Sequence, residues 1–431
     1  MPRLSSSAAT RLAAGEVLAL VLGEKRTMAD ALARTERLDD LEPRDRAFAR
    51  AIVSATLRRL GSIDAVLANF LQTPLPETAY LGQALLRAGA AQILVLETPA
   101  HAAVSETVDA ANAERAARGF ARLMNAVLRK VASDGPALLA ALPPGADLPP
   151  WLYTRWRAAY GDEAERIAAA LRTEPPLDLT VKDNAEARAA KLGGVVSPTG
   201  GVRLTDAHGV AALEGYAEGA WWVQDSAAAL PAKLLGDIAG KRVLDLCAAP
   251  GGKTLQLANA GAIVTALDKS AQRLERVREN LARTNLAAEI VAADALTWSP
   301  GEPFDAVLLD APCTATGTMR RHPDIAWLRR PSDIQALAAQ QRALLARAQH
   351  FVKPGGVLVY AVCSLEPEEG PAIVSEALES GAWTLSPIAP EEIGGHAQLL
   401  TARGELRTLP SHFAAEGGLD GFYAARLIRT P

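Results

Sequence analysis

The sequence predicts an α/β protein with a parallel sheet in its C-terminal half, an all-α bundle at its N-terminus and a small α+β region between the two. Two observations support this prediction. Apolar segments of strand length recur from residue 242 onward, whereas residues 8–131 show helical periodicity with almost no strand alternation. A chain of 431 residues is also too long for one typical domain, so we expect two or three.

The N-terminal region is rich in alanine and leucine at helical spacing, with short Gly- and Pro-containing turns between the segments. Helices of this length joined by short turns pack as a compact bundle, which we assign to residues 1–135. A stripe of basic residues also recurs at helical spacing, and from periodicity alone a solvated helix face is its simpler interpretation. The stripe consists of Arg115, Arg118, Arg122, Arg129 and Lys130. The predicted helices cover residues 8–22, 27–38, 44–60, 62–70, 80–96, 101–112 and 116–131.

Four prolines between residues 143 and 150 mark a linker that we place at residues 136–150. Helix and strand signals then alternate, which predicts a small α+β subdomain at residues 151–237. Tryptophans are dense in this region, and we expect them to pack at domain junctions rather than to stack on bases. Asp225 is explained as the cap of a helix that leads into the next domain. The expected elements are helices 151–172 and 184–192 and strands 177–181 and 202–204.

The most informative motif is the stretch Asp-Leu-Cys-Ala-Ala-Pro-Gly-Gly-Lys-Thr at residues 245–254. It lies between a strand-like run and a helix-like run, and such a turn holds a nucleotide-like ligand at the carboxyl edge of an α/β sheet. Its two glycines let the backbone approach the ligand, and the start of the helix offers unpaired N–H groups. A phosphate-binding P-loop would need a glycine where Cys247 stands, so the sequence excludes that interpretation.

Two further apolar segments end in an acid. Residues 263–268 end in Asp268, at nearly the spacing from Asp245 at which an acid meets the ribose hydroxyls of a bound nucleotide. Residues 290–294 repeat the pattern and end in Asp294, although a helix N-cap explains this acid equally well. Because ligands of open parallel sheets bind beyond the carboxyl ends of the strands, both acids are candidates for one site.

The last two apolar segments lead to cysteines. Residues 304–310 end in Asp310 and are followed by Ala-Pro-Cys313, and residues 356–362 lead directly to Cys363. A free cysteine is most often a small buried hydrophobe, and we expect this for Cys247, the third cysteine of the chain. The sequence contexts of the other two indicate chemistry instead.

Composition narrows the classes of protein. Three scattered cysteines make no disulfide framework and no Cys/His spacing suits zinc, so we expect no metal and a reducing, cytoplasmic setting. No apolar run is long enough to span a bilayer, so we expect no membrane partner. The net charge of −4 argues against indiscriminate coating of nucleic acid, but it leaves room for local basic patches.

The C-terminal motifs resemble those of the RNA cytosine-5 methyltransferases of the NOL1/NOP2/Sun family. The resemblance covers residues 150–431 and rests on a cofactor loop, two cysteine motifs and two closing segments. These are residues 247–254, 310–313, 362–369, 409–412 and 420–423. The chain departs from the family pattern at Thr314, at Gly370 and at the two residues before Cys363, and none of these departures removes a group that carries the chemistry.

The N-terminal region resembles the NusB-like RNA-binding domain, most clearly at residues 44–48 and 120–129. A NusB-like domain ahead of a cytosine-5 methyltransferase resembles bacterial enzymes that act on 16S ribosomal RNA. The resemblance therefore implies RNA as the partner, free or in an early assembly state, and a monomeric enzyme.

Cytosine C5 is a poor nucleophile, so a thiolate must first add at C6 and convert the ring to an enamine. The enamine carbon then takes a methyl group from a sulfonium donor, and a base removes the C5 proton so that the thiol can leave. A carboxyl group near ring N3 and the exocyclic amine offsets the charge of the attack, and Asp310 is placed for that role. This chemistry alone does not say whether Cys313 or Cys363 attacks.

The resemblance implies Cys363 as the nucleophile and Cys313 as the residue that helps to release the product. It also implies a Rossmann-like domain at residues 238–431, a small RNA-recognition-like subdomain before it, and S-adenosylmethionine as the cofactor. The residues expected to bind this cofactor are Cys247, Ala248, Ala249, Pro250, Gly251, Gly252, Lys253, Asp268, Asp294 and Asp310.

Two other classes of function fit the sequence less well. A methyltransferase acting on an exocyclic amine usually carries an Asn/Asp-Pro-Pro-aromatic turn, but this chain has Ala-Pro-Cys313 at that point. A non-catalytic RNA-binding factor would have no chemical use for an intact cofactor loop and two cysteine motifs. The sequence therefore favours the cytosine-5 methyltransferase.

Overall fold

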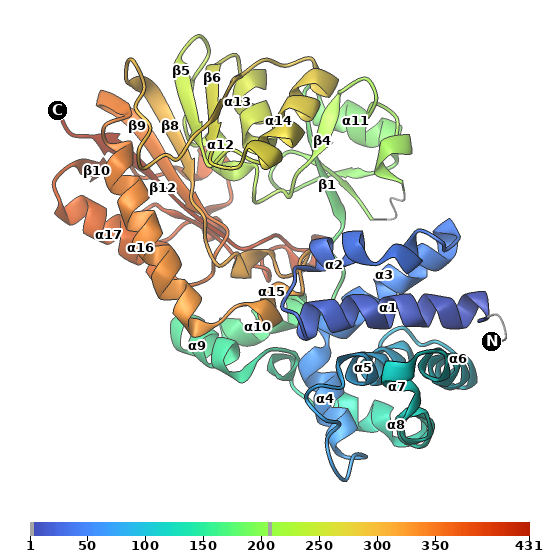
Figure 1. Ribbon diagram of the computed structural model, residues 1–431. Helices are drawn as coiled ribbons and strands as arrows, with labels where there is room; N and C mark the ends of the chain where they lie inside the picture. The colour runs from blue at the N-terminus through green and yellow to red at the C-terminus, as the bar shows by residue number, and fades with distance from the viewer. Residues whose placement is uncertain (1–3, 206–208) are drawn as a thin grey trace. The chain divides into compact units, whose positions relative to one another are not determined.

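The structure is a computed structural model that describes residues 4–205 and 209–431, and these form two compact units (Figure 1). The first unit extends to Thr173 and also includes Met319–Arg330, while the second comprises Glu174–Thr318 and Pro331–Pro431. The predicted all-α bundle and α/β sheet are both confirmed. None of the helices between residues 4 and 205 or between 209 and 431 combines the length and apolar character that a membrane crossing requires.

The first unit is a helical bundle in which α1 packs against α3, α5 and α6. The apolar face of α1 is fully buried at Leu12, Val17 and Leu18, which makes this helix the centre of the bundle. The helices are α1 (Ser6–Leu22), α2 (Met28–Arg34), α3 (Pro43–Arg58), α4 (Leu60–Ala68), α5 (Tyr80–Leu94), α6 (Ala100–Ala113), α7 (Arg115–Arg118), α8 (Ala121–Ala140), α9 (Pro150–Tyr160), α10 (Glu163–Ala170) and α15 (Ile325–Leu328), with short 3-10 turns η1 (Glu36–Leu38) and η2 (Pro144–Asp147).

Three of the predicted helices differ from those observed. The helix expected at 116–131 is divided into α7 and α8, and α8 continues through Pro136 into the expected linker. The helix expected at 151–172 is also two helices, because Gly161 with φ 57° ends α9. The helix expected at 27–38 ends at Arg34 and is followed by a 3-10 turn. Each break lies within a stretch whose apolar periodicity continues, so periodicity alone did not reveal it.

The segment Met319–Arg330 lies far along the chain from the other residues of the first unit. The indole Nε1 of Trp327 donates a hydrogen bond to the carbonyl oxygen of Leu57 at 2.8 Å. The Met28 amide donates to Asp324 Oδ2, also at 2.8 Å. Trp327 and its neighbours pack on the core formed by the N-terminal helices. The N-terminal bundle is therefore completed by a piece of the C-terminal half.

The second unit begins with a small antiparallel sheet of strand order β2-β3-β1-β4. Arg203 and Asp178 form a bidentate ion pair across this sheet, with two N–O distances of 2.7 Å and both side chains 1% exposed. Trp221 and Trp222 are buried, as their interpretation as packing residues predicted. The elements are β1 (Leu177–Val181), α11 (Ala185–Leu192), β2 (Val195–Val196), β3 (Val202–Leu204), η3 (Val210–Ala212) and β4 (Trp221–Val223).

The large sheet has strand order β10-β12-β9-β8-β5-β6-β7, with β11 paired to β12. Strands β5 to β9 are parallel, and β12 runs antiparallel beside β9. The strands are β5 (Arg242–Leu246), β6 (Ile263–Asp268), β7 (Glu289–Ala292), β8 (Phe304–Asp310), β9 (Val352–Val362), β10 (Trp383–Leu385), β11 (Leu406–Thr408) and β12 (Phe422–Arg429). The helices are α12 (Leu230–Lys233), α13 (Gly252–Asn259), α14 (Ala271–Thr284), α16 (Pro331–Ala348) and α17 (Pro371–Glu379), with 3-10 turns η4 (Thr316–Thr318), η5 (Pro367–Glu369), η6 (Pro390–Ile393), η7 (Ala397–Leu399) and η8 (Ala414–Glu416).

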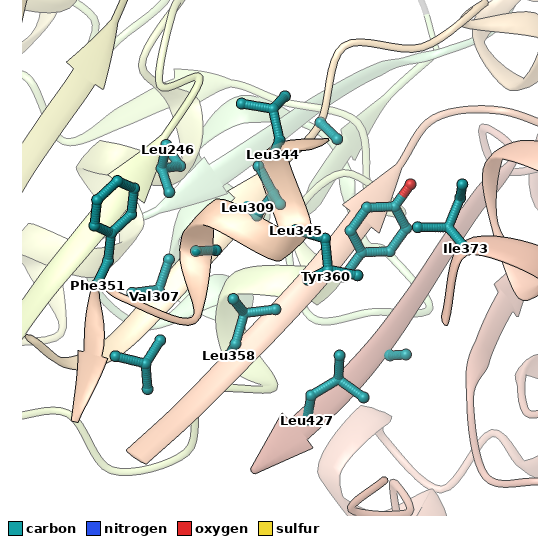
Figure 2. Packing of buried hydrophobic residues seen from close by; sticks show 14 of the residues in the cluster. Leu246, Val307, Leu309, Leu344, Leu345, Phe351, Leu358, Tyr360, Ile373 and Leu427 are labelled. Carbon is teal, nitrogen blue, oxygen red and sulfur yellow. The ribbon is translucent and has the colours of Figure 1, made fainter. Parts of the chain in front are cut away.

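Alternate residues of the parallel strands point to opposite faces of this sheet. On one face Leu309 of β8 and Tyr360 of β9 pack with Leu345 of α16 and Ile373 of α17 (Figure 2). The opposite face packs on α12 and α13. Because both faces are covered, β5, β8 and β9 are fixed side by side, and the residues that follow their carboxyl ends lie at one edge of the sheet.

Candidate active site

The two cysteine motifs meet at this edge. Cys313 Sγ and Cys363 Sγ are 3.4 Å apart, and both side chains are partly buried. The loop after β8 carries Cys313, and its Gly317 amide donates to the carbonyl oxygen of Cys363 at 3.0 Å. The sequence placed both cysteines at strand ends, and the structure adds that their sulfur atoms are in contact.

The two thiols differ in their surroundings. The hydrogen bond with Cys363, followed by burial, raises the pKa of the Cys313 thiol well above its usual range. Cys313 therefore remains protonated at neutral pH. Cys363 is one of the groups whose electrostatic interaction raises the pKa of the Lys253 ammonium. Nucleophilic cysteines are found in electropositive, partly exposed surroundings, so these surroundings suit an attacking thiol better at Cys363 than at Cys313.

Lys253 forms an ion pair with Asp310, with Nζ 2.7 Å from Oδ2. Burial lowers the pKa of Lys253, but the charge and hydrogen bond of Asp310, together with Cys363, outweigh burial and raise it. The ammonium also lies 5.3 Å from the centre of the Phe422 ring. The sequence predicts Lys253 only as a cofactor-loop residue, whereas its side chain contacts the predicted catalytic carboxylate. Asp310 is 30% exposed at its side chain and remains accessible to a substrate.

The cofactor loop follows β5 and has an irregular backbone. Cys247 has φ 63° and Gly251 has φ 106°, and the Ala249–Pro250 peptide bond is cis. The Ala248 amide donates to the carbonyl oxygen of Leu267 in the neighbouring strand at 3.0 Å. Burial raises the pKa of Cys247 to about 12, so this thiol stays neutral, as expected for a residue whose side chain packs.

Asp268 stabilises the cofactor loop. Its Oδ2 accepts a hydrogen bond from the Ala249 amide at 3.2 Å, and its Oδ1 accepts one from the Ser270 amide at 2.9 Å. The residue is only 3% exposed, and Arg273 lies 3.6 Å from the carboxylate. A carboxylate has about four acceptor sites, so two remain for a ligand. A role in ribose binding thus remains a prediction, alongside this contact with the loop.

Asp294 lies two residues beyond the end of β7, so the strand expected to include it ends earlier, at Ala292. The side chain is exposed, and its Oδ1 accepts a hydrogen bond from the Leu296 amide at 2.9 Å. This hydrogen bond closes a turn, and no helix lies among the described residues between β7 and β8, so the helix N-cap that the alternative interpretation of Asp294 described is not observed. Contact of Asp294 with the cofactor stays a prediction.

Asp245 at the end of β5 belongs to the motif, but the sequence did not single it out as a site residue. Thr254 Oγ1 donates to its Oδ2 at 2.5 Å, while its Oδ1 is buried without a hydrogen-bond partner among residues 4–205 and 209–431. Burial raises the pKa of Asp245 to about 7. A buried acceptor such as Asp245 Oδ1 is costly when it has no partner. A ligand that joins a positive charge to a nucleoside would supply that partner at the cofactor loop.

Two glycines join the cysteine loops to the closing segment. The Gly421 amide donates to the carbonyl oxygen of Gly317 at 2.8 Å, and a Cβ atom on Gly317 would lie 1.9 Å from Gly421 O. Asp225 holds the same segment, because its Oδ1 accepts from the Ala227 amide at 2.8 Å and the Asp420 amide at 3.2 Å. The helix that Asp225 was expected to cap begins only at Leu230, so Asp225 caps a turn instead. The sequence around Asp225 carries no signal of its hydrogen bond with Asp420.

The basic stripe of the first unit is exposed. All five residues lie on α7 and α8 with exposed side chains, and none forms an ion pair within the part of the chain that the structure describes. Arg129 is turned toward Asn125 Oδ1 at 3.2 Å. Exposed cations without carboxylate partners can contact a polyanion without first breaking an ion pair.

Comparison with known proteins assigns the family. A model of the 16S rRNA methyltransferase RsmB/F family matches residues 232–428, a NusB family model matches residues 8–133, and a model of the RsmF/B-like ferredoxin-like domain matches residues 148–192. The ribosomal RNA small subunit methyltransferase B of Pseudomonas putida is 39% identical, over 97% of this chain and 98% of that protein. The chain belongs to the ribosomal RNA small subunit methyltransferase B family. The Xanthomonas campestris member is 39% identical over 99% of this chain and 98% of its own.

Solved structures support the fold. The crystal structure of PH0851 matches 97% of this chain and 98% of its own with a TM-score of 0.76 at 23% identity. The crystal structure of NSun6 from Pyrococcus horikoshii covers 66% of this chain and 98% of its own with a TM-score of 0.57 at 21% identity. Membership of the small subunit methyltransferase B family confirms the sequence prediction of a methyltransferase that uses S-adenosylmethionine. It also argues against a non-catalytic RNA-binding factor.

Proposed function

We propose that this protein transfers a methyl group from S-adenosylmethionine to C5 of a cytosine in 16S ribosomal RNA, through a covalent adduct between Cys363 and C6. The observation that carries the proposal is the contact between Cys313 and Cys363, 3.4 Å apart, beside the ion pair of Lys253 and Asp310. The names of the curated relatives support ribosomal RNA of the small subunit as the substrate. The enzyme acts as a monomer in the cytoplasm on free RNA or an early assembly state.

In the first step the Cys363 thiolate adds to C6 of the cytosine. The C5–C6 π pair moves to C4–C5 and the C4–N3 pair moves to N3, which takes up a proton through the carboxyl group of Asp310 and returns it when the adduct breaks down. The same carboxyl group accepts a hydrogen bond from the exocyclic amine. Lys253 orients the Asp310 carboxylate through its 2.7 Å contact. S-adenosylmethionine supplies an electrophilic methyl group on a sulfonium, and C5 becomes a carbon nucleophile only after the thiolate has added.

In the last step a base removes the C5 proton, and the electrons of the C6–S bond return to Cys363 as thiolate. Cys313 is suited to this role because its neighbour controls its acidity. The main cause of its raised pKa is the hydrogen bond to Cys363. Once Cys363 is a neutral thioether, its hydrogen bond and charge no longer raise the pKa of Cys313, while burial and the charge of Glu369 still do. Cys313 therefore acts as a relay, passing its own proton to water as it takes the one from C5, and no free thiolate is needed. The product is methylated RNA with one proton released.

Alanine variants of the two cysteines test this mechanism on denaturing gels with RNA and S-adenosylmethionine. We expect Cys363→Ala to abolish methyl transfer and to form no covalent adduct. We expect Cys313→Ala to methylate once and then stall as a protein–RNA adduct, because the thioether is covalent and its elimination is the blocked step. An adduct in Cys363→Ala and none in Cys313→Ala would reverse the assignment. Methyl transfer without an adduct in either variant would contradict the covalent mechanism.

A further inference from the structure

Glu369 is a fully buried carboxylate between the two cysteine loops. Its Oε1 accepts a hydrogen bond from the Thr314 amide at 2.9 Å, and its Oε2 accepts from the hydroxyl groups of Thr314 and Ser364. Thr314 directly follows Cys313, and Ser364 directly follows Cys363. One carboxylate therefore binds the residue next to each thiol.

Hydrogen bonds from two other buried residues hold Glu369 in place. Gln341 of α16 donates from Nε2 to Glu369 Oε1 at 3.0 Å and to the carbonyl oxygen of Pro312 at 2.8 Å. The hydroxyl group of Tyr360 in β9 donates to the Glu369 carbonyl oxygen at 2.6 Å. Both Gln341 and Tyr360 are 0% exposed. The position of Glu369 is thus determined by the sheet and by a helix that covers it, not by the loops alone.

Burial of a carboxylate is strongly destabilising unless hydrogen bonds replace the lost water. Glu369 meets this requirement, because an ionised carboxylate has about four acceptor sites and four donors fill them. An amide in its place has one oxygen and would direct N–H groups at donors. A carboxylate, and not an amide, is therefore needed at position 369 to bind both cysteine loops at once.

We propose that Glu369 is a positioning residue that sets the separation of the Cys313 and Cys363 sulfur atoms. Through Thr314 and Ser364 it holds the thiols 3.4 Å apart without touching the reacting atoms. In the mechanism proposed above, on which this part of the inference rests, Cys313 must act on the adduct that Cys363 has formed. Glu369 then governs the release of the product more strongly than the initial attack.

Disulfide closure measures the separation without RNA or cofactor. Diamide takes two electrons and two protons from the paired thiols and is reduced to the hydrazine, and the protein loses two free thiols. We expect Glu369→Gln to close the Cys313–Cys363 disulfide at least about 10-fold more slowly than the wild type, because small misplacements of reacting groups are costly. Thr314→Val keeps the side-chain shape, removes one of the four donors, and should slow closure in the same direction. Glu376→Gln, which removes a partly exposed ion pair with Arg342, should close at the wild-type rate.

Turnover provides a readout that a general loss of stability would not give. We expect Glu369→Gln to accumulate the covalent RNA adduct during steady-state turnover, whereas the wild type and Glu376→Gln do not. Wild-type closure rates in both Glu369→Gln and Thr314→Val would overturn the positioning role. If closure slows in the variants but Cys313→Ala never forms an adduct with RNA, the positioning role stands and the covalent mechanism fails.

Discussion

Lys253 Nζ lies 2.7 Å from Asp310 Oδ2, so the first turn of α13 is joined to the end of β8. Lys253 belongs to the cofactor loop and Asp310 to the first cysteine motif. The lysine is nearly buried, and its ammonium is paired with Asp310. One loop can therefore bind the cofactor through its backbone and, through its single lysine, orient the carboxylate that we propose to be catalytic.

Replacement of Lys253 by methionine should slow methyl transfer more than it weakens cofactor binding. Without the ammonium, Asp310 loses its charged hydrogen-bond donor, and we expect single-turnover rates to fall roughly 10²-fold, as for other groups that stabilise developing charge. The S-adenosylmethionine Kd, measured by calorimetry, should change less than about 10-fold, because we expect the loop to bind the cofactor mainly through its backbone. Lys253→Arg retains the charge and should recover part of the rate. A large loss of cofactor affinity with an intact rate would show that Lys253 serves only in cofactor binding.

Asp245 should make the cofactor-free protein less stable as the pH rises. Its pKa in the fold, about 7, exceeds the ordinary value of 3.8 because of burial. For an acid with a raised pKa, the stabilising contribution is present below the ordinary value and is lost as the pH rises through the folded one. A difference of one between the folded and unfolded pKa values corresponds to about 1.4 kcal/mol in the free energy of unfolding. Urea unfolding from about pH 4 to about pH 8 should show this decline in the wild type and a flatter profile in Asp245→Asn.

Asp245 should also make the affinity for the cofactor depend on pH. A cationic cofactor near Asp245 would favour its charged form, so binding should release a proton below pH 7 and become tighter as the pH rises toward that value. Calorimetry in buffers of different ionisation heat measures the proton release. Asp245→Asn serves as the comparison, because it cannot titrate. An Asp245→Asn protein that keeps the wild-type pH dependence would show that another group is responsible.

Gly317→Ala should separate the cysteine loop from the closing segment. The new Cβ atom would lie 1.9 Å from Gly421 O, and backbone cannot yield as a flexible side chain does. Overpacking of this kind costs about 1–3 kcal/mol, and the amide of Gly317 also binds the Cys363 carbonyl oxygen. We expect both the free energy of unfolding and the methyl-transfer rate to fall. Gly301→Ala is the matched control, because nothing lies within 4 Å of its Cβ position. If Gly317→Ala and Gly301→Ala have the same free energy of unfolding and the same methyl-transfer rate, the close approach of Gly317 to Gly421 has no role in stability or catalysis.

Much of the catalytic sheet could be predicted from the sequence because its signals are local. Strands 263–268 and 304–310 have the predicted bounds, since each is a mostly apolar run that ends in an acid. Parallel strands also share one carboxyl edge, which is why Cys313 and Cys363 could be expected near each other. The same logic failed for Asp294, because a strand can end before the acid that follows its apolar run.

The contacts that could not be predicted join residues distant in sequence. Neither periodicity nor motif spacing indicates that Glu369 binds both cysteine loops, or that Trp327 completes the N-terminal bundle. The second contact changes how the N-terminal domain should be tested. A chain that starts at Trp151 would remove Leu57 and expose Trp327, so truncation would disturb the segment that follows Cys313 as well as RNA binding. Surface substitutions are the better test.

Charge removal on α8 should weaken RNA binding and leave the cofactor site unchanged. Arg122, Arg129 and Lys130 are exposed, and none is paired with a carboxylate in the described chain. If they bind phosphates, the triple alanine variant should hold 16S ribosomal RNA fragments less tightly. The slope of log K against log salt should also become shallower by roughly 2 to 3, because each neutralised phosphate accounts for about 0.7–0.9 of that slope.

Lys241→Ala, which changes an exposed lysine of the second unit, is the control for this triple variant and should alter neither the affinity nor the salt slope. The S-adenosylmethionine Kd of the triple variant should equal that of the wild type, because the stripe belongs to a different unit from the cofactor loop. Filter binding at several salt concentrations measures the slope. A triple variant with the wild-type salt slope would show that this helix face is only solvated, which is the simpler interpretation of its periodicity.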